Sequence, residues 1–146
     1  IGPEPVTARL GSASGSANYL TDAEIGKPVK LIGDSLYNLT AVGDQIEGFI
    51  TAVEGYTADD FSIGSVNSQG RKRVTLDGLQ ATPGTGTCAV GDYVVTGTVV
   101  AKGTALTVPP KVCKATTQTG MYFAWRIVSL EGSGAVGQYA VIERVS

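Results

Sequence analysis

The chain has 146 residues, 20 of them glycine and none histidine, and a formal net charge of −2 with a pI near 5.0. This length is that of one ordinary domain with its own hydrophobic core. Without histidine, Ser–His–Asp and Cys–His catalytic arrangements and His-based zinc sites are excluded. Charged residues make up 16%, below the usual ~25%, so we expect part of the surface to be covered by other protein.

Composition also argues against direct binding to nucleic acid or to membranes. Nucleic-acid-binding domains usually carry a basic stripe and a high pI, and no apolar run approaches the length of a membrane-spanning helix. Residues 1–5 lack the basic and apolar regions of a signal peptide.

Cys88 and Cys113 lack Cys-x-x-Cys spacing, so we expect two small buried side chains, with a single disulfide as the alternative. No cofactor or metal is expected.

Residues 1–20 are predicted to form an extended N-terminal arm that precedes a β-rich domain over residues 21–146. The stretch from Gly11 to Ala17 has the low complexity of a flexible segment. The arm is expected to become ordered against a partner, with a disordered tail as the alternative. Its apolar anchors would be Val6, Leu10, Tyr19 and Leu20.

Two one-turn helices are predicted. Thr21 and Glu24 form a capping box, and Gly26 followed by Pro28 ends the turn. A similar turn is expected over Thr57–Asp60, where the acidic pair 59–60 reads as an exposed turn and not as a calcium loop.

Strands are predicted for the remainder, because β-branched and aromatic residues alternate between turns spaced roughly 8–12 residues apart. The fold class is therefore all-β, a single-domain sandwich or a partly open barrel. In Arg71–Asp77 the alternation predicts one wet face. The predicted strands are Val29–Ile32, Leu36–Ala41, Ile46–Glu54, Phe61–Val66, Arg71–Asp77, Tyr93–Val100, Tyr122–Leu130 and Tyr139–Val145.

Two glycine-containing motifs are interpreted as turns. Ala41–Asp44 recurs as Ala89–Asp92, each time before a β-rich segment, which indicates one turn used twice. Gly132–Gly137 matches the dinucleotide-binding pattern G-x-G-x-x-G. Because a strand pattern follows it at once and leaves no room for a βαβ unit, we predict a hairpin loop.

The basic cluster Arg71, Lys72 and Arg73 follows a good turn sequence. It is interpreted as a solvated hairpin face or as a docking point for an acidic protein surface. Nucleic acid is less favoured, because no aromatic platform surrounds the cluster.

Phe123, Trp125 and Ile127 lie on one face of the predicted strand, so core packing is expected, with a carbohydrate-binding platform as the alternative.

Several segments, taken in order, resemble the small β-rich capsid decoration proteins of tailed bacteriophages. The resemblance covers most of residues 20–146 and rests on the order of common turn and strand motifs. The segments that carry it are Leu20–Leu31, Gly48–Val53, Gly70–Val74, Ala89–Val94, and Gly134–Gly137 with Ile142–Val145.

The resemblance implies a structural virion protein, not an enzyme, on the outer surface of an assembled head. Its partner would be the major capsid protein, which it would stabilise by non-covalent bridging, as a homo-oligomer with a trimer favoured. We expect the arm and Arg71–Arg73 to make the contacts. The alternatives are a glycan- or host-surface-binding module and another minor virion structural protein. An enzyme without histidine would need a Ser–Lys pair or carboxylates alone.

Overall fold

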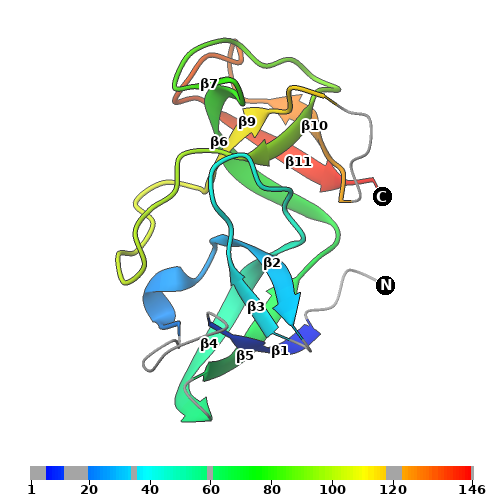
Figure 1. Cartoon of the computed structure of the whole chain (residues 1–146). Coiled ribbons are helices and arrows are strands. Elements are labelled where there is room, and N and C mark those ends of the chain that lie inside the picture. Colours follow the sequence, from blue (N-terminus) through cyan, green and yellow to red (C-terminus); the bar gives the residue numbers. More distant parts are fainter. Residues whose placement is uncertain (1–5, 12–19, 34–35, 59–60, 118–122, 146) are drawn as a thin grey trace. The chain divides into compact units, whose positions relative to one another are not determined.

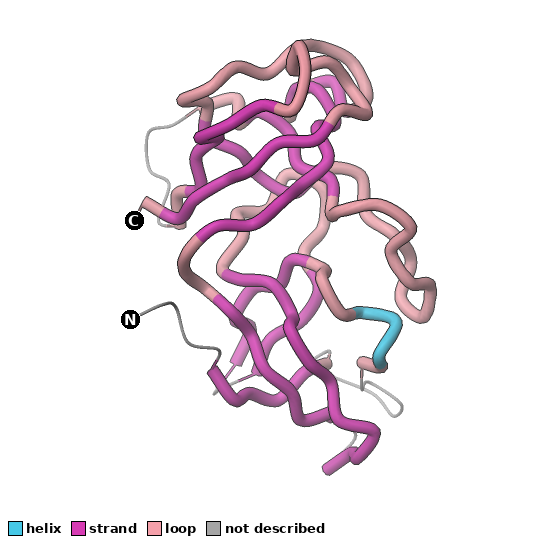
Figure 2. The backbone as a smooth tube through the Cα atoms, turned by 180° about the vertical axis from the view of Figure 1, so that it is seen from behind, coloured by secondary structure: helices cyan, strands magenta, loops and turns pink. Residues whose placement is uncertain are grey.

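The computed structural model describes residues 6–11, 20–33, 36–58, 61–117 and 123–145, and the statements below concern these residues. They form eleven strands and one helical turn, so the predicted all-β class is confirmed (Figures 1 and 2). The described chain divides into two compact units. Unit 1 holds the described residues of 6–39, 47–68 and 100–107, and unit 2 those of 40–46, 69–99 and 108–145.

Unit 1 is a closed five-stranded barrel in the order β1-β3-β2-β4-β5, with β5 returning to β1. Its strands are β1 (Val6–Leu10), β2 (Pro28–Gly33), β3 (Leu36–Leu39), β4 (Gly48–Ala58) and β5 (Phe61–Asn67). The pairings are antiparallel except for the short parallel contact between β1 and β3. A closed barrel has no sheet edge, so every strand finds backbone partners on both sides.

The N-terminal segment differs from the expected arm. Val6–Leu10 pairs along its whole length with β5, from Val6 opposite Val66 to Leu10 opposite Ser62. Leu10 and Leu20 are almost fully buried, in a core completed by Val29, Ile50, Val53 and Val66. Burial of these leucines removes apolar surface from water within unit 1 itself, so they need no partner to cover them.

The helical turn η1 (Asp22–Glu24) begins at the predicted capping box. Thr21 Oγ1 accepts a hydrogen bond from the Ala23 N–H at 3.3 Å, and the Glu24 carboxylate reaches back to the Thr21 N–H at 3.4 Å. Gly26 follows at a φ of +91°, which suits glycine and ends the turn. The second predicted turn is wrong at its start, because Thr57 and Ala58 continue β4; residues 59–60 lie outside the described residues.

Unit 2 is a six-stranded sheet in the order β11-β10-β8-β9-β6-β7, and β11 pairs in addition with β6. Its strands are β6 (Arg71–Leu79), β7 (Thr82–Pro83), β8 (Tyr93–Thr96), β9 (Lys111–Lys114), β10 (Trp125–Leu130) and β11 (Tyr139–Arg144). Only β6 and β9 run parallel among these pairs. The G-x-G-x-x-G segment joins antiparallel β10 to β11, so the predicted hairpin loop is confirmed.

The core of unit 2 contains the aromatic strand predicted to pack inward. Trp125 and Ile127 are buried, and the Trp125 indole N–H donates to the Ile46 carbonyl at 3.0 Å. A buried indole usually finds such a partner. Neighbouring strands add buried aliphatic side chains, namely Val74, Leu76, Val94, Val112, Ala140 and Ile142.

The wet face predicted for β6 extends over only half of the strand. Arg71 and Arg73 are exposed, whereas Thr75 and Asp77, on the same side, are buried. The Thr75 hydroxyl donates to the Pro109 carbonyl at 2.7 Å. The Asp77 carboxylate accepts from the Thr98 N–H and hydroxyl at 2.7 and 2.6 Å. The alternation alone would predict that Thr75 and Asp77 are exposed to water. In the structure, loop backbone groups and the Thr98 hydroxyl satisfy their hydrogen bonds instead.

Candidate interaction surfaces

The predicted basic cluster is divided between two faces of β6 and is largely neutralised. Arg71 Nε lies 2.9 Å from Glu143 Oε2. Arg73 binds Glu131 through two nitrogens, at 2.8 and 2.9 Å, in the bidentate geometry that suits guanidinium and carboxylate. Lys72 points to the other side and is half-buried, and this burial lowers its pKa. The three charges therefore do not form one positive patch.

The pair formed by Arg73 and Glu131 is held by a further contact and is fully charged at neutral pH. The Arg73 guanidinium lies 4.3 Å from the centre of the Tyr139 ring, within cation–π range. The hydrogen bond to Glu131 raises the pKa of Arg73, and the hydrogen bond from Arg73 lowers the pKa of Glu131. Both side chains remain exposed.

A row of side chains crosses β8, β10, β11 and β6 on the same face. Arg126 lies opposite Glu143 on one side and opposite Tyr93 on the other, and Glu143 lies opposite Arg71. Directly opposed residues share a face of a sheet, so the row reads Tyr93, Arg126, Glu143, Arg71. Arg126 is exposed, and in the described part of the chain its guanidinium makes no hydrogen bond, ion pair or ring contact.

The predicted contact residues of the arm are not brought together on a surface. Leu10 and Leu20 are buried in the core of unit 1, so neither side chain is exposed on the surface of the described chain. Val6 lies in β1, opposite Val66. Tyr19 lies outside the described residues.

The repeated turn is confirmed in detail. In Ala41–Asp44 the Asp44 N–H donates to the Ala41 carbonyl at 3.1 Å, and Asp44 Oδ2 accepts from the Ala41 N–H at 2.9 Å. Asp92 makes the same two bonds with Ala89, at 3.1 and 2.8 Å. The third residue of each, a glycine, has a φ of +88° or +95°, as a type II turn requires.

The structure adds a third copy that the sequence reading missed. In Ala135–Gln138 the Gln138 N–H donates to the Ala135 carbonyl at 3.2 Å, and Gly137 has a φ of +89°. The Gln138 side chain accepts from the Gly134 N–H at 3.1 Å, the neighbouring amide to the one bound in the first two copies. We call Ala41–Asp44, Ala89–Asp92 and Ala135–Gln138 the Ala-Val-Gly turns. A search that allowed Gln for Asp would have found this copy.

Each Ala-Val-Gly turn is attached to a strand by the same pair of backbone hydrogen bonds. The glycine N–H donates to the carbonyl of one strand residue, whose own N–H donates to the carbonyl of the fourth turn residue. The strand residues are Thr96, Ile127 and Leu76, and all six distances lie between 2.8 and 3.0 Å. The valine, which makes none of these hydrogen bonds, lies at the tip of the turn.

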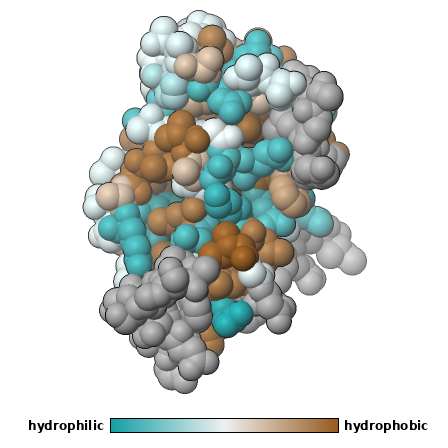
Figure 3. All heavy atoms as spheres, in the orientation of Figure 1, coloured by the Kyte–Doolittle hydropathy of each residue, from teal (hydrophilic) through white to brown (hydrophobic). Residues whose placement is uncertain are grey.

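The three tip valines are exposed. Val42, Val90 and Val136 retain 45, 59 and 41% of their accessible surface. At the second position of a type II turn many residues fit, and the turn's hydrogen bonds involve only its other three residues. Figure 3 shows apolar side chains standing as separate groups among polar ones on one face. The turn's hydrogen bonds do not involve the valine, and yet the same exposed apolar residue stands at this position in all three copies.

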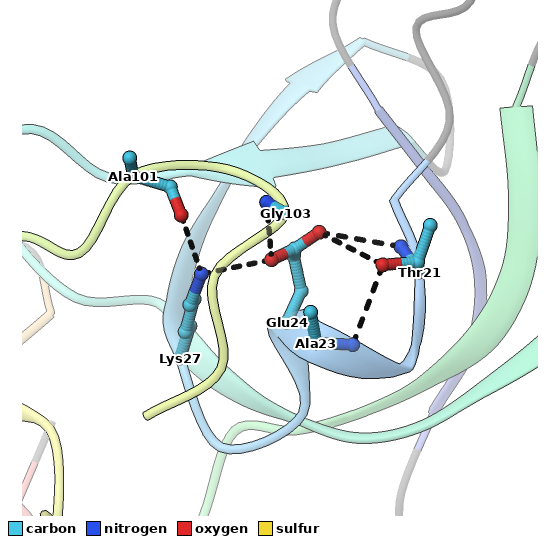
Figure 4. A network of polar contacts seen from close by, with 6 residues as sticks. All are labelled: Thr21, Ala23, Glu24, Lys27, Ala101 and Gly103. Atoms are coloured by element: carbon cyan, nitrogen blue, oxygen red, sulfur yellow. Dashed lines mark hydrogen bonds and ion pairs between the residues drawn. The ribbon is translucent and has the colours of Figure 1, made fainter. Parts of the chain in front are cut away.

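Unit 1 contains a buried ion pair. Lys27 Nζ lies 2.8 Å from Glu24 Oε2, with side-chain exposures of 4 and 0% (Figure 4). The 100–107 segment closes over it, because the Gly103 N–H donates to Glu24 at 3.1 Å and Lys27 donates to the Ala101 carbonyl at 3.2 Å. Burial acts to raise the pKa of Glu24, but the Lys27 and backbone bonds outweigh it, and the pKa is lowered.

The two cysteines are free and buried, as expected. Burial raises the pKa of both thiols, that of Cys113 to about 12 with a further contribution from Asp77. Such thiols are protonated at neutral pH and unreactive, since the thiolate is the nucleophile. They fit packing roles, not chemistry.

The aromatic side chains do not form a carbohydrate platform among the described residues. Trp125 is buried, and the Phe123 ring is half-buried with the Arg144 guanidinium 5.0 Å from its centre. Tyr122 lies outside the described residues. The predicted core packing of Trp125 and Ile127 is thus confirmed.

Within the described ranges, no helix is long and apolar enough to cross a membrane, and no group of three or more His, Cys, Asp or Glu side chains is placed to hold a metal ion. Comparison of the chain with protein-family models, with curated proteins and with solved structures finds no match in any of the three.

Proposed function

We propose that this protein is a structural virion protein that binds the outer surface of an assembled phage head and stabilises the shell by bridging its subunits. The observation that carries the proposal is the set of three Ala-Val-Gly turns, each with an exposed valine at its tip. Each turn is attached to a strand by two backbone hydrogen bonds, which hold its apolar tip against the sheet of unit 2. The resemblance of residues 20–146 to capsid decoration proteins supplies the partner.

The mechanism follows from linkage. A protein that binds the assembled shell and not the free subunits adds its binding free energy to the stability of the shell. Each tip valine that becomes buried contributes through the apolar surface it removes from water, about 25 cal/mol for each Å². Several contacts for each copy, or several copies in a homo-oligomer, increase the effective affinity without any new type of contact.

The test is to add the purified protein to undecorated heads, measure the bound stoichiometry by sedimentation, and follow head disruption on heating. We expect saturable binding at a fixed ratio and a higher disruption temperature. Absence of binding, or binding with no gain in head stability, would overturn the proposal.

A triple variant, Val42→Thr, Val90→Thr and Val136→Thr, tests the tips while keeping their β-branched shape. We expect affinity for heads to fall about tenfold or more, because each substitution places a hydroxyl in a contact that was apolar. The matched control is Val99→Thr, Val108→Thr and Val145→Thr, three exposed valines of the same unit outside the turns. Equal losses of affinity in the two triple variants would show that the turns are not part of the interface with the head.

A further inference from the structure

The arginines on the outer face of β6, β11 and β10 differ in one respect that bears on binding. Arg71 and Arg73 each bind a glutamate of their own unit, at 2.9 and 2.8 Å. Arg126, which lies in the same cross-strand row as Arg71, is exposed and makes no such pair within the described chain. One guanidinium on this face thus retains all of its donors for an outside ligand.

The neighbours of Arg126 restrict which ligand fits. Glu143, directly opposite on β11, already accepts from Arg71. Tyr93, directly opposite on β8, is half-buried and packs against Val95, Cys113 and Ala115. Arginine and tyrosine are both enriched at interface hot spots, and a bound partner that also covers the Tyr93 ring would exclude water from the charged contact.

The balance of charge favours a carboxylate. Arg71 and Arg73 are paired with Glu143 and Glu131, and the carboxylate of Asp77, on the same side of β6, is buried and accepts hydrogen bonds from Thr98. Arg126 is thus the exposed arginine of this face whose charge has no carboxylate bound to it within the described chain. The glutamates would repel the closely spaced charges of a nucleic acid backbone. A single Asp or Glu on a protein surface can bind Arg126 in bidentate geometry and brings only one negative charge near Glu143, whose own charge is already paired with Arg71.

We propose that Arg126, supported by Tyr93, is the docking point for an acidic side chain on the surface of the capsid shell. This inference rests on the proposed function, because it names the chemistry that the shell presents to this face. An exposed pair between Arg126 and a partner carboxylate steers association and fixes register, and its contribution to affinity grows as the tyrosine excludes water.

The first experiment measures binding of Arg126→Glu to undecorated heads. We expect affinity to fall at least tenfold, with Arg126→Lys intermediate because an ammonium cannot replace the bidentate fork. Lys102→Glu is the matched control: it changes the net charge equally but lies in the exposed 100–107 segment of unit 1, and we expect a change below twofold. Heads that bind Arg126→Glu as well as wild type overturn the inference and leave the proposed function standing.

A second experiment separates the two claims, because it does not need heads. A short poly-glutamate peptide, inorganic phosphate and single-stranded DNA are titrated into the ¹⁵N-labelled protein in turn. The inference expects the peptide to shift the Tyr93 and Arg126 signals, with the shifts lost in Arg126→Glu. No response to the peptide, or a stronger one to DNA, overturns the acidic-protein assignment. If heads are not bound but the peptide is, the proposed function fails and the carboxylate site survives.

Discussion

Two acid–base pairs in this molecule have the same length and different surroundings. Lys27–Glu24 in unit 1 and Arg73–Glu131 in unit 2 both have a nitrogen–oxygen distance of 2.8 Å. The first pair is buried, with exposures of 4 and 0%, whereas the second retains 52 and 39%. The length of an ion pair therefore says little about its energetic role, which depends on what happens to each charge when its partner is lost.

The largest expected effect comes from breaking the buried pair. Lys27→Met leaves the Glu24 carboxylate buried without its countercharge, and we expect a loss of about 3–5 kcal/mol in the free energy of unfolding, measured by urea denaturation. Lys102→Met, which removes an exposed lysine from the segment that covers the pair, should remain close to wild type.

The double variant Glu24→Gln with Lys27→Met separates the effect of the unpaired charge from the effect of lost packing. It removes both charges, so it should be more stable than Lys27→Met alone, because no uncompensated buried charge remains. A double variant as unstable as the single one would mean that lost packing, and not the orphaned charge, accounts for the effect.

The same pair predicts a dependence on pH. The pKa of Glu24 is lowered from 4.5 in the folded chain, so its stabilising contribution is complete above the unfolded value. That contribution is lost as the pH falls below 4.5 and through the lowered folded pKa. The Gly103 amide, which donates to Glu24, should lose hydrogen-exchange protection over this range, after correction for intrinsic exchange. In Glu24→Gln the protection should not change with pH in this window.

The Ala-Val-Gly turns should give an intermediate effect. Gly91 and Gly137 have positive φ values, and a Cβ at either would meet nothing within 4 Å. Alanine there therefore costs only the backbone strain of a left-handed residue, about 1–2 kcal/mol, measured as a shift of the urea midpoint. Val90→Thr leaves the turn backbone intact and should not move the midpoint. A destabilised Val90→Thr would show that the valine serves folding.

Prediction from sequence succeeded where the signal is local. The capping box at Thr21 and the turn glycines depend on residues close in the chain, and the structure contains both. The alternation in β6 predicts the exposure of Arg71 and Arg73, but it fails for the second half of the strand, where loops bury the polar side chains. The strand β1 (Val6–Leu10) was missed although its apolar residues alternate with Thr7 and Arg9, because the pattern is only five residues long and is followed by the low-complexity stretch Gly11–Ala17. Its antiparallel partners lie in β5, more than fifty residues away, and only that pairing separates a barrel strand from an extended arm.

The surfaces were harder to predict than the fold. Arg71–Arg73 reads as one basic cluster, but Glu131 and Glu143, distant in sequence, neutralise its two exposed members. Arg126 carries no motif, and only the register of β10 against β8 and β11 places it in the cross-strand row. Whether a charged side chain on a strand is paired depends on the residue opposite it on the neighbouring strand, and the sequence alone does not show which residue that is.

The smallest effect is expected at the exposed pair. Arg73→Gln or Glu131→Gln should leave the urea midpoint within error of wild type at both low and high salt, because exposed partners are solvated by water when separated. A shift as large as that of Gly91→Ala in Arg73→Gln but not in Glu131→Gln would show that the contact of Arg73 with the Tyr139 ring, and not the ion pair, stabilises unit 2. The same large shift in both variants would contradict the prediction. The comparison also bears on binding: a partner carboxylate must displace Glu131 to reach Arg73, whereas at Arg126 no such exchange is needed.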